Sequence, residues 1–153
     1  MGLNNSTTLA LWINTESKGT VALLSKYNAA GTGAGHIFRL SGGRPQLVLG
    51  GMDSQTYPPM ATGTVKVNDG NWHHVTVVIT VGEGIQFYVD GVAAGSRSTR
   101  VVGGGDGTSN LNLGVCQWVP FGGYFNGMMD EVEVYDRALS ASEVNSVYLL
   151  SLQ

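Results

Sequence analysis

The densest group of titratable side chains in the sequence is the acidic run from Asp130 to Asp136. If this run is a regular β-strand, its side chains alternate between two faces, so Glu131 and Glu133 share a face about 7 Å apart. Inverting glycosidases separate their two catalytic carboxyl groups by a similar distance. The alternation also places Val132 and Val134 on the opposite face. With these valines inward, the glutamates face solvent, and we do not expect the chain to be an enzyme.

Asp130 is predicted to lie in the register of the two valines, at the start of this strand. A carboxylate on a buried face is costly unless it has partners. Hydrogen bonds from nearby backbone amides or from an arginine would supply them.

Two uncharged loop segments have the composition of a sugar-binding surface. Aromatic rings offer flat faces for the apolar side of a sugar, and amides can match its hydroxyls. Trp118 lies among glycine and proline residues, so a place in the core explains it less well than it explains Trp12 or Trp72, which lie in strand patterns. Aromatic side chains can also fold beneath their own loops, and that alternative stays open. The candidate ligand-binding residues are Trp118, Gln117, Phe121 and Tyr124 in the segment 116–124, and Tyr57 in the segment 52–58.

Several other kinds of chemistry are disfavoured by composition. A single cysteine, Cys116, excludes an internal disulfide and a zinc cluster built on several thiolates. The consecutive His73 and His74 point to opposite faces of a strand and cannot chelate one metal together. Eight scattered basic residues and a net charge of −3 predict no nucleic-acid partner, and no apolar run reaches the roughly 20 residues of a membrane span.

The elements that must position these residues are mostly strands. Alternating apolar and polar residues recur between glycine-rich breaks, and the chain has 23 glycines and only 12% charged residues. Gly82-Glu83 and Asp90-Gly91 predict tight hairpin turns. Ser140 and Glu143 form a capping-box pattern that predicts one short helix over 141–150. The strands are predicted at 8–13, 21–25, 36–40, 46–49, 63–67, 72–81, 84–90, 92–94, 110–116 and 124–136. This pattern predicts an all-β, antiparallel β-sandwich with one C-terminal helix, in a single domain covering 1–153.

Two motifs add a resemblance to a known family. The run Trp72-His73-His74-Val75 is followed by Tyr88-Val89-Asp90-Gly91, and the later segment 125–140 has the sequence FNGMMDEVEVYDRALS. In order and spacing, these motifs resemble the laminin G-like jelly rolls of the concanavalin A-like lectin/glucanase superfamily. The resemblance implies two curved antiparallel sheets of about a dozen strands. It also implies an extracellular or cell-surface module that belongs to a larger protein with neighbouring domains.

The resemblance bears on the site residues as well. In similar domains the aspartate that corresponds to Asp130 often ligates a structural calcium ion, so calcium is the predicted cofactor and Asp130 its candidate ligand. Related glucanases carry an E-x-D-x-x-E strand, which this sequence lacks. Family members usually have a further strand before the one that corresponds to 8–13, whereas only seven residues precede it here.

The sequence therefore predicts a non-catalytic, lectin-like module whose partner is a carbohydrate. The alternative is a module for protein interaction or adhesion. A glycoside-acting enzyme is the third and least favoured hypothesis.

Overall fold

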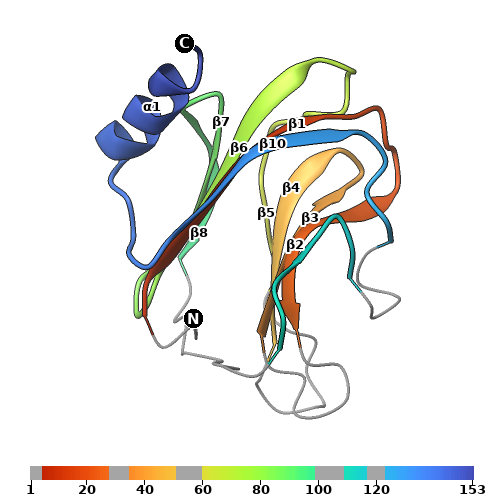
Figure 1. The fold of residues 1–153 in the computed structure, drawn as a ribbon. Helices are drawn as coiled ribbons and strands as arrows, with labels where there is room; N and C mark the ends of the chain where they lie inside the picture. The colour runs from red at the N-terminus through yellow and green to blue at the C-terminus, as the bar shows by residue number, and fades with distance from the viewer. Residues whose placement is uncertain (1–4, 28–34, 51–59, 99–108, 117–122) are drawn as a thin grey trace.

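The chain forms two antiparallel five-stranded sheets packed face to face (Figure 1). The computed structural model describes residues 5–27, 35–50, 60–98, 109–116 and 123–153. The first sheet has the strand order β10-β1-β6-β7-β8 and the second has the order β5-β4-β3-β2-β9. The strands are β1 (Thr7–Asn14), β2 (Thr20–Tyr27), β3 (Gly35–Ser41), β4 (Arg44–Gly50), β5 (Met60–Thr62), β6 (Trp72–Thr80), β7 (Gly84–Val89), β8 (Val92–Ser98), β9 (Asn112–Leu113) and β10 (Met128–Tyr135). The predicted all-β sandwich is confirmed.

The core lies between the two sheets and follows from the alternation of each strand. Leu9, Leu11 and Ile13 of β1 point inward and are fully buried, opposite inward residues of the second sheet such as Phe38. The rings of Phe38 and Phe87 stack across the core with centroids 6.5 Å apart. Each fully buried side chain of this size contributes about 1.5–3 kcal/mol, so this layer dominates the stability of the fold.

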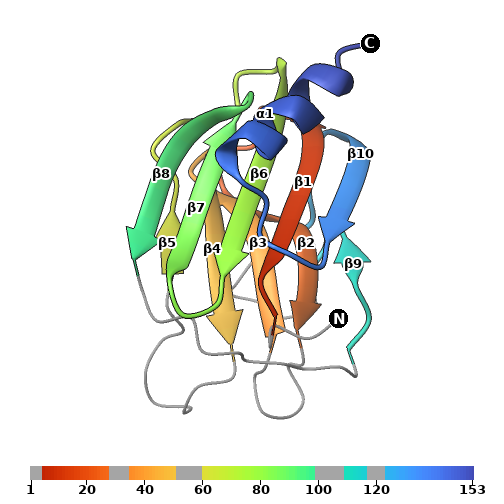
Figure 2. The same cartoon turned by 90° about the vertical axis from the view of Figure 1, so that its left-hand side faces the viewer.

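The single helix described, α1 (Ala141–Leu150), covers part of the outer face of the first sheet (Figure 2). Val144 is buried and, with Leu139, packs on Val78 and Tyr88 of the sheet. The predicted capping box is present: the Glu143 amide donates to Ser140 Oγ at 3.3 Å, and Glu143 Oε2 accepts from the Ser140 amide at 2.8 Å. Among the residues described, this helix is too short to cross a bilayer.

Glu143 is also tied to the end of β10. Arg137 donates to it at 2.7 Å, and this bond, together with the Ser140 cap, lowers the pKa of Glu143 to about 2. The start of the helix is thereby tied to Arg137, in the segment between β10 and α1.

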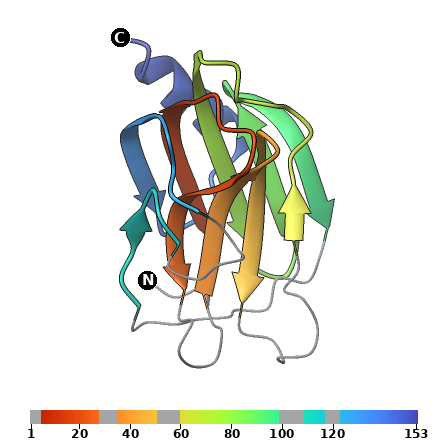
Figure 3. The same ribbon diagram turned by 90° about the vertical axis from the view of Figure 1, so that its right-hand side faces the viewer.

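The predicted strand at 63–67 is wrong. β5 ends at Thr62, and the chain then leaves the second sheet and crosses toward the first (Figure 3). The Gly63 amide donates to Pro45 O at 2.7 Å in one sheet, and the Thr64 amide donates to Ala94 O at 2.8 Å in the other. The polar backbone groups of this segment are satisfied by both sheets, so the alternation of its side chains did not reflect a ladder. The predicted strands at 110–116 and 124–136 are shorter than expected, as β9 and β10.

Candidate functional site

A β-bulge in β10 brings two carboxylates together on the outer face of the first sheet. Ala10 pairs with Glu133 and Trp12 pairs with Asp130, so two residues of β10 stand opposite the single residue Leu11 of β1. Glu131 adopts a φ of +46° at this point. An extra residue in one strand interrupts the alternation of its side chains. Asp130 and Glu131 are consequently both exposed.

The predicted regular alternation of side chains along β10 is wrong at the bulge. Met129 and Val132 both pack against the core, which requires the two residues between them to face outward. Asp130 therefore does not share the face of Val132, and its carboxylate is not buried. Asp130 Oδ1 accepts a hydrogen bond from the Glu131 amide at 2.8 Å, which is the backbone-amide partner that the sequence suggested.

An open hollow of about 310 Å³ lies beside these carboxylates. We call it the tryptophan hollow; its lining residues are Trp12, Trp72, Asp130, Glu131, Ser151 and Leu152. Trp12 points outward because Leu11 and Ile13 point inward, and it is paired directly with Asp130. Trp72 begins β6 and remains 42% exposed. The hollow lies where α1 ends and no longer covers the sheet.

The floor of the tryptophan hollow is held rigidly. Trp12 Nε1 donates to Ser151 Oγ at 2.9 Å, and Ser151 Oγ donates to Tyr148 O at 2.8 Å. The Trp12 ring also lies 5.4 Å from the His74 ring and 5.7 Å from the Tyr148 ring, between centroids. Trp12 is thus a fixed part of the floor of the hollow, whereas Trp72 is the tryptophan that remains exposed.

The start of β6, which carries Trp72, is anchored by its neighbour His73. One ring nitrogen lies 2.8 Å from Asp90 Oδ2 and the other lies 3.2 Å from Asp69 Oδ1. Burial lowers the pKa of His73, but the hydrogen bonds and charges of Asp90 and Asp69 outweigh it and raise the pKa above its usual value. The imidazolium form, which can donate from both nitrogens, therefore persists to higher pH than in a free histidine.

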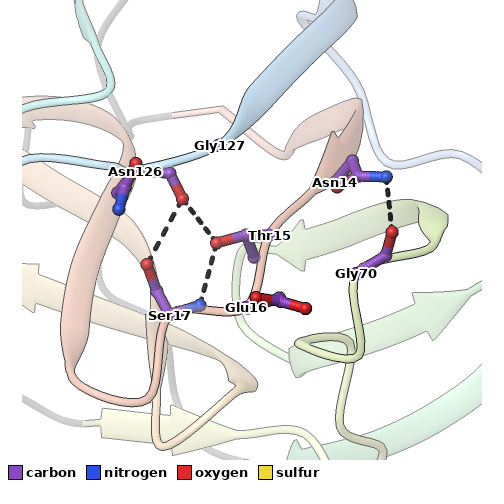
Figure 4. A pocket seen from close by; sticks show the side chains of 7 residues that line it. All are labelled: Asn14, Thr15, Glu16, Ser17, Gly70, Asn126 and Gly127. Atoms are coloured by element: carbon purple, nitrogen blue, oxygen red, sulfur yellow. Dashed lines mark hydrogen bonds between the residues drawn. The ribbon is translucent and has the colours of Figure 1, made fainter.

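A second, polar hollow of about 470 Å³ lies at the same end of the sandwich (Figure 4). Thr15 Oγ1 donates to Asn126 O at 2.6 Å, and Asn14 Nδ2 donates to Gly70 O at 2.7 Å. Asn14 is the cross-strand partner of Trp72, so the two hollows adjoin. The lining residues of the polar hollow are Asn14, Thr15, Glu16, Ser17, Gly70, Asn126 and Gly127. Amide, hydroxyl and carboxylate groups suit this hollow to hydrogen-bonding a polyhydroxylated ligand.

None of the ligand-binding residues predicted from the sequence is placed by the structure in either hollow. Trp118, Gln117, Phe121 and Tyr57 lie outside the residues described, so their role stays a prediction. Tyr124 is 82% exposed. Its neighbour Gly123 pairs with Val21 of the second sheet, and Tyr124 lines neither hollow.

Trp72 was missed because its strand pattern was interpreted as core. The available signal was its position as the first residue of a strand directly after Gly70 and Asn71, where an outward side chain can be left uncovered.

The structure offers two observations on metal binding and catalysis. Across the described ranges, no three His, Cys, Asp or Glu side chains gather as a metal site. Calcium binding at Asp130 can also use backbone carbonyls, and it stays a prediction. The bulge removes the regular alternation on which the paired arrangement of Glu131 and Glu133 was based, and Glu133 instead accepts a hydrogen bond from Tyr135 Oη at 2.9 Å.

Comparisons with solved structures reveal the same fold at low sequence identity. No curated protein sequence matches the chain. The binding domain of botulinum neurotoxin serotype G superposes with a TM-score of 0.73 at 13% identity, over 98% of this chain and 37% of that one. The botulinum neurotoxin serotype D ligand binding domain, in complex with N-acetylneuraminic acid, superposes with a TM-score of 0.71 at 12% identity. The match covers 99% of this chain and 38% of that one. The chain thus spans under two fifths of these toxin domains.

A smaller neighbour covers the chain more evenly. The CBM40 of the Ruminococcus gnavus IT-sialidase, bound to α2,3-sialyllactose, has a TM-score of 0.75 at 17% identity, over 94% of this chain and 83% of that one. A family model described as the concanavalin A-like lectin/glucanases superfamily matches residues 1–145. Together with the two five-stranded sheets, this match shows that the chain belongs to the concanavalin A-like lectin/glucanases superfamily, as its motifs predicted.

Proposed function

We propose that the chain is a non-catalytic carbohydrate-binding module and that the tryptophan hollow holds the sugar. The observation that carries this proposal is the exposed indole of Trp72 beside the carboxylates of Asp130 and Glu131. An aromatic face packs against the apolar side of a sugar ring, and carboxylates accept hydrogen bonds from its hydroxyls. The tryptophan hollow offers both an aromatic face and carboxylates.

The dimensions and the neighbourhood of the hollow support the proposal. Its volume of about 310 Å³ is at the lower end of the range of small-ligand sites, which suits one sugar ring. The adjoining polar hollow can take the next ring of a chain, with Asn14 between the two. We therefore expect an oligosaccharide to bind more tightly than a monosaccharide.

The solved neighbours support the class of ligand without fixing its identity. Two of them are described in complex with sialylated or sialic acid ligands. Several of these neighbours are domains of toxins or of a sialidase, so an extracellular module of a larger protein is the setting we propose for this chain.

The test is binding of the purified chain to a broad glycan array, followed by calorimetry with the best oligosaccharide. Trp72→Ala should weaken binding strongly. The exposed indole surface is roughly 100 Å² if the whole side chain offers about 250 Å², so its loss costs about 2.5 kcal/mol, or about 70-fold in Kd.

The matched control is Val92→Ala, which removes a 69% exposed apolar side chain from β8, at the opposite edge of the same sheet. This variant should bind like the parent. A blank array, or a Trp72→Ala variant that binds with unchanged affinity while folded, would contradict the proposal.

A further inference from the structure

We infer that the tryptophan hollow selects a sugar that carries a protonated amine, such as an unacetylated glucosamine residue, over neutral and acidic sugars. The inference rests on the proposed function, because it names the class of sugar for that same hollow. It follows from four features that all favour positive charge.

The first feature is a pair of carboxylates without a cation. Asp130 and Glu131 both line the hollow, and neither takes part in an ion pair within the described part of the chain. Two negative charges on adjacent residues repel each other, and a cation placed between them relieves that repulsion.

The second feature is the composition of the sheet beneath the hollow. Strands β1, β6 and β10 form its floor and contain three acidic residues, Asp130, Glu131 and Glu133, but no lysine or arginine. Strand β6 carries two histidines. His73 is hydrogen-bonded to Asp90 and Asp69, so its charge is paired with carboxylates outside the hollow. The other is His74, whose pKa is lowered by burial. It is therefore neutral around pH 7 and does not offset the acidic groups.

The third feature is the end of α1. Ser151, the C-cap residue, and Leu152 line the hollow, and the last turn of the helix carries no basic residue. The C-terminal end of a helix carries a partial negative charge that is unscreened here by any lysine or arginine of the same turn. This end faces the opening that holds the two carboxylates.

The fourth feature is the aromatic surface. Ammonium groups are attracted to the faces of indole rings, and tryptophan is the most effective of the aromatic side chains in this interaction. Trp12 and Trp72 both line the hollow. The indole that packs on a sugar ring can therefore also contact an amine on that ring.

These features separate three kinds of sugar. A neutral sugar would gain the hydrogen bonds and the aromatic contact but no attraction to the negative charges of Asp130 and Glu131. A sugar with a carboxylate, such as sialic acid, would be repelled by Asp130 and Glu131. An amine should gain about tenfold in Kd over its neutral counterpart, from one exposed charge pair and one cation–π contact.

The experiment compares four oligosaccharides by calorimetry, in mildly acidic buffer in which the sugar amine is charged. They are glucosamine tetramer, N-acetylglucosamine tetramer, glucose tetramer and sialyllactose. The inference predicts that the glucosamine tetramer binds about tenfold more tightly than the two neutral tetramers and that the preference shrinks as salt is added.

The double variant Asp130→Asn, Glu131→Gln keeps the shape of both side chains and removes their charges. It should reduce the preference for the amine from about tenfold to about threefold, because the cation–π contact with the tryptophans remains. Glu83→Gln is the matched control, because Glu83 is an exposed carboxylate in the β6–β7 turn that lines a different surface. That variant should retain the preference.

The outcomes separate this inference from the function on which it rests. If a neutral tetramer or sialyllactose binds as tightly as the amine, the inference is overturned while carbohydrate binding stands. If the charge-neutral double variant keeps the full preference, the inference also fails. If neither the array nor any of the four sugars gives binding, the proposed function fails, and the inference fails with it.

Discussion

Gly127 controls how β10 approaches β1, and therefore where Asp130 and Glu131 are presented. It has a φ of +151°, and a Cβ atom added there would lie 2.2 Å from Asn14 O. An ordinary contact begins at 3.4 Å, so Gly127→Ala requires the backbone to move by more than 1 Å. Asn14 cannot move freely because it is paired with Met128 on one side and Trp72 on the other.

The magnitude follows from two contributions. The unfavourable φ costs about 1 kcal/mol, and the steric conflict with a fixed backbone adds about 2–3 kcal/mol. For a domain of this size, a total of about 3–4 kcal/mol corresponds to a fall of roughly 10 °C in Tm. Urea unfolding and thermal unfolding, both followed by circular dichroism, measure the two quantities.

Gly82 provides the matched control for this substitution. It also has a positive φ, +84°, but a Cβ added there meets nothing within 4 Å. Gly82→Ala should cost only the backbone term of about 1 kcal/mol, or roughly 3 °C. If the two variants lose the same stability, the close packing of β10 on β1 described above is wrong.

Four further predictions concern two histidines, the helix cap and calcium. The pKa of His73 is raised on folding, so the stability that this side chain contributes is complete below its unfolded pKa of 6.5 and is lost as the pH rises through its folded pKa. The difference in unfolding free energy between the parent and His73→Gln should therefore shrink over that range. A pH-independent difference in urea unfolding would contradict the pairing of His73 with Asp90 and Asp69. His36 behaves oppositely, because burial first and the Lys26 charge second lower its pKa to about 4, so the parent should lose about 3 kcal/mol between pH 6.5 and 4, a loss that His36→Leu should largely abolish. Ser140→Ala removes the cap and should cost about 1 kcal/mol, whereas an unchanged Tm would show that the cap is dispensable. If Asp130 ligates calcium, added calcium should raise the Tm of the parent but not of Asp130→Asn; a parent Tm indifferent to calcium and to chelator would refute this role.

The parts of the fold that were predictable are those with local signals. The hairpin of β6 and β7 was expected within one residue at each end, because two β-branched runs are separated by a glycine turn. Asp90 and Gly91 have φ angles of +51° and +75°, as the predicted type I′ turn requires. The helix was predicted at its observed bounds because the capping box marks its first turn.

The site was harder to predict because pairing between distant segments creates it. The bulge at Glu131 depends on how β10 pairs with β1, more than a hundred residues earlier, and alternation along β10 alone cannot reveal it. Trp72 is exposed because α1 ends before reaching it, and no pattern within β6 encodes that end. The acidic run could be singled out from the sequence, but its place beside Trp12 and Trp72 required the fold.

We propose that the sugar lies against Trp72, and the three tryptophans of the chain allow a direct test of this position. The indole N–H signals of Trp12, Trp72 and Trp118 can be assigned in a two-dimensional NMR spectrum by single substitutions. Titration with the oligosaccharide selected on the array should shift the Trp72 signal most and the Trp12 signal next. Shifts confined to Trp118, with Trp72 unchanged at saturation, would contradict binding at the tryptophan hollow and locate the ligand at the loop that the sequence alone had favoured.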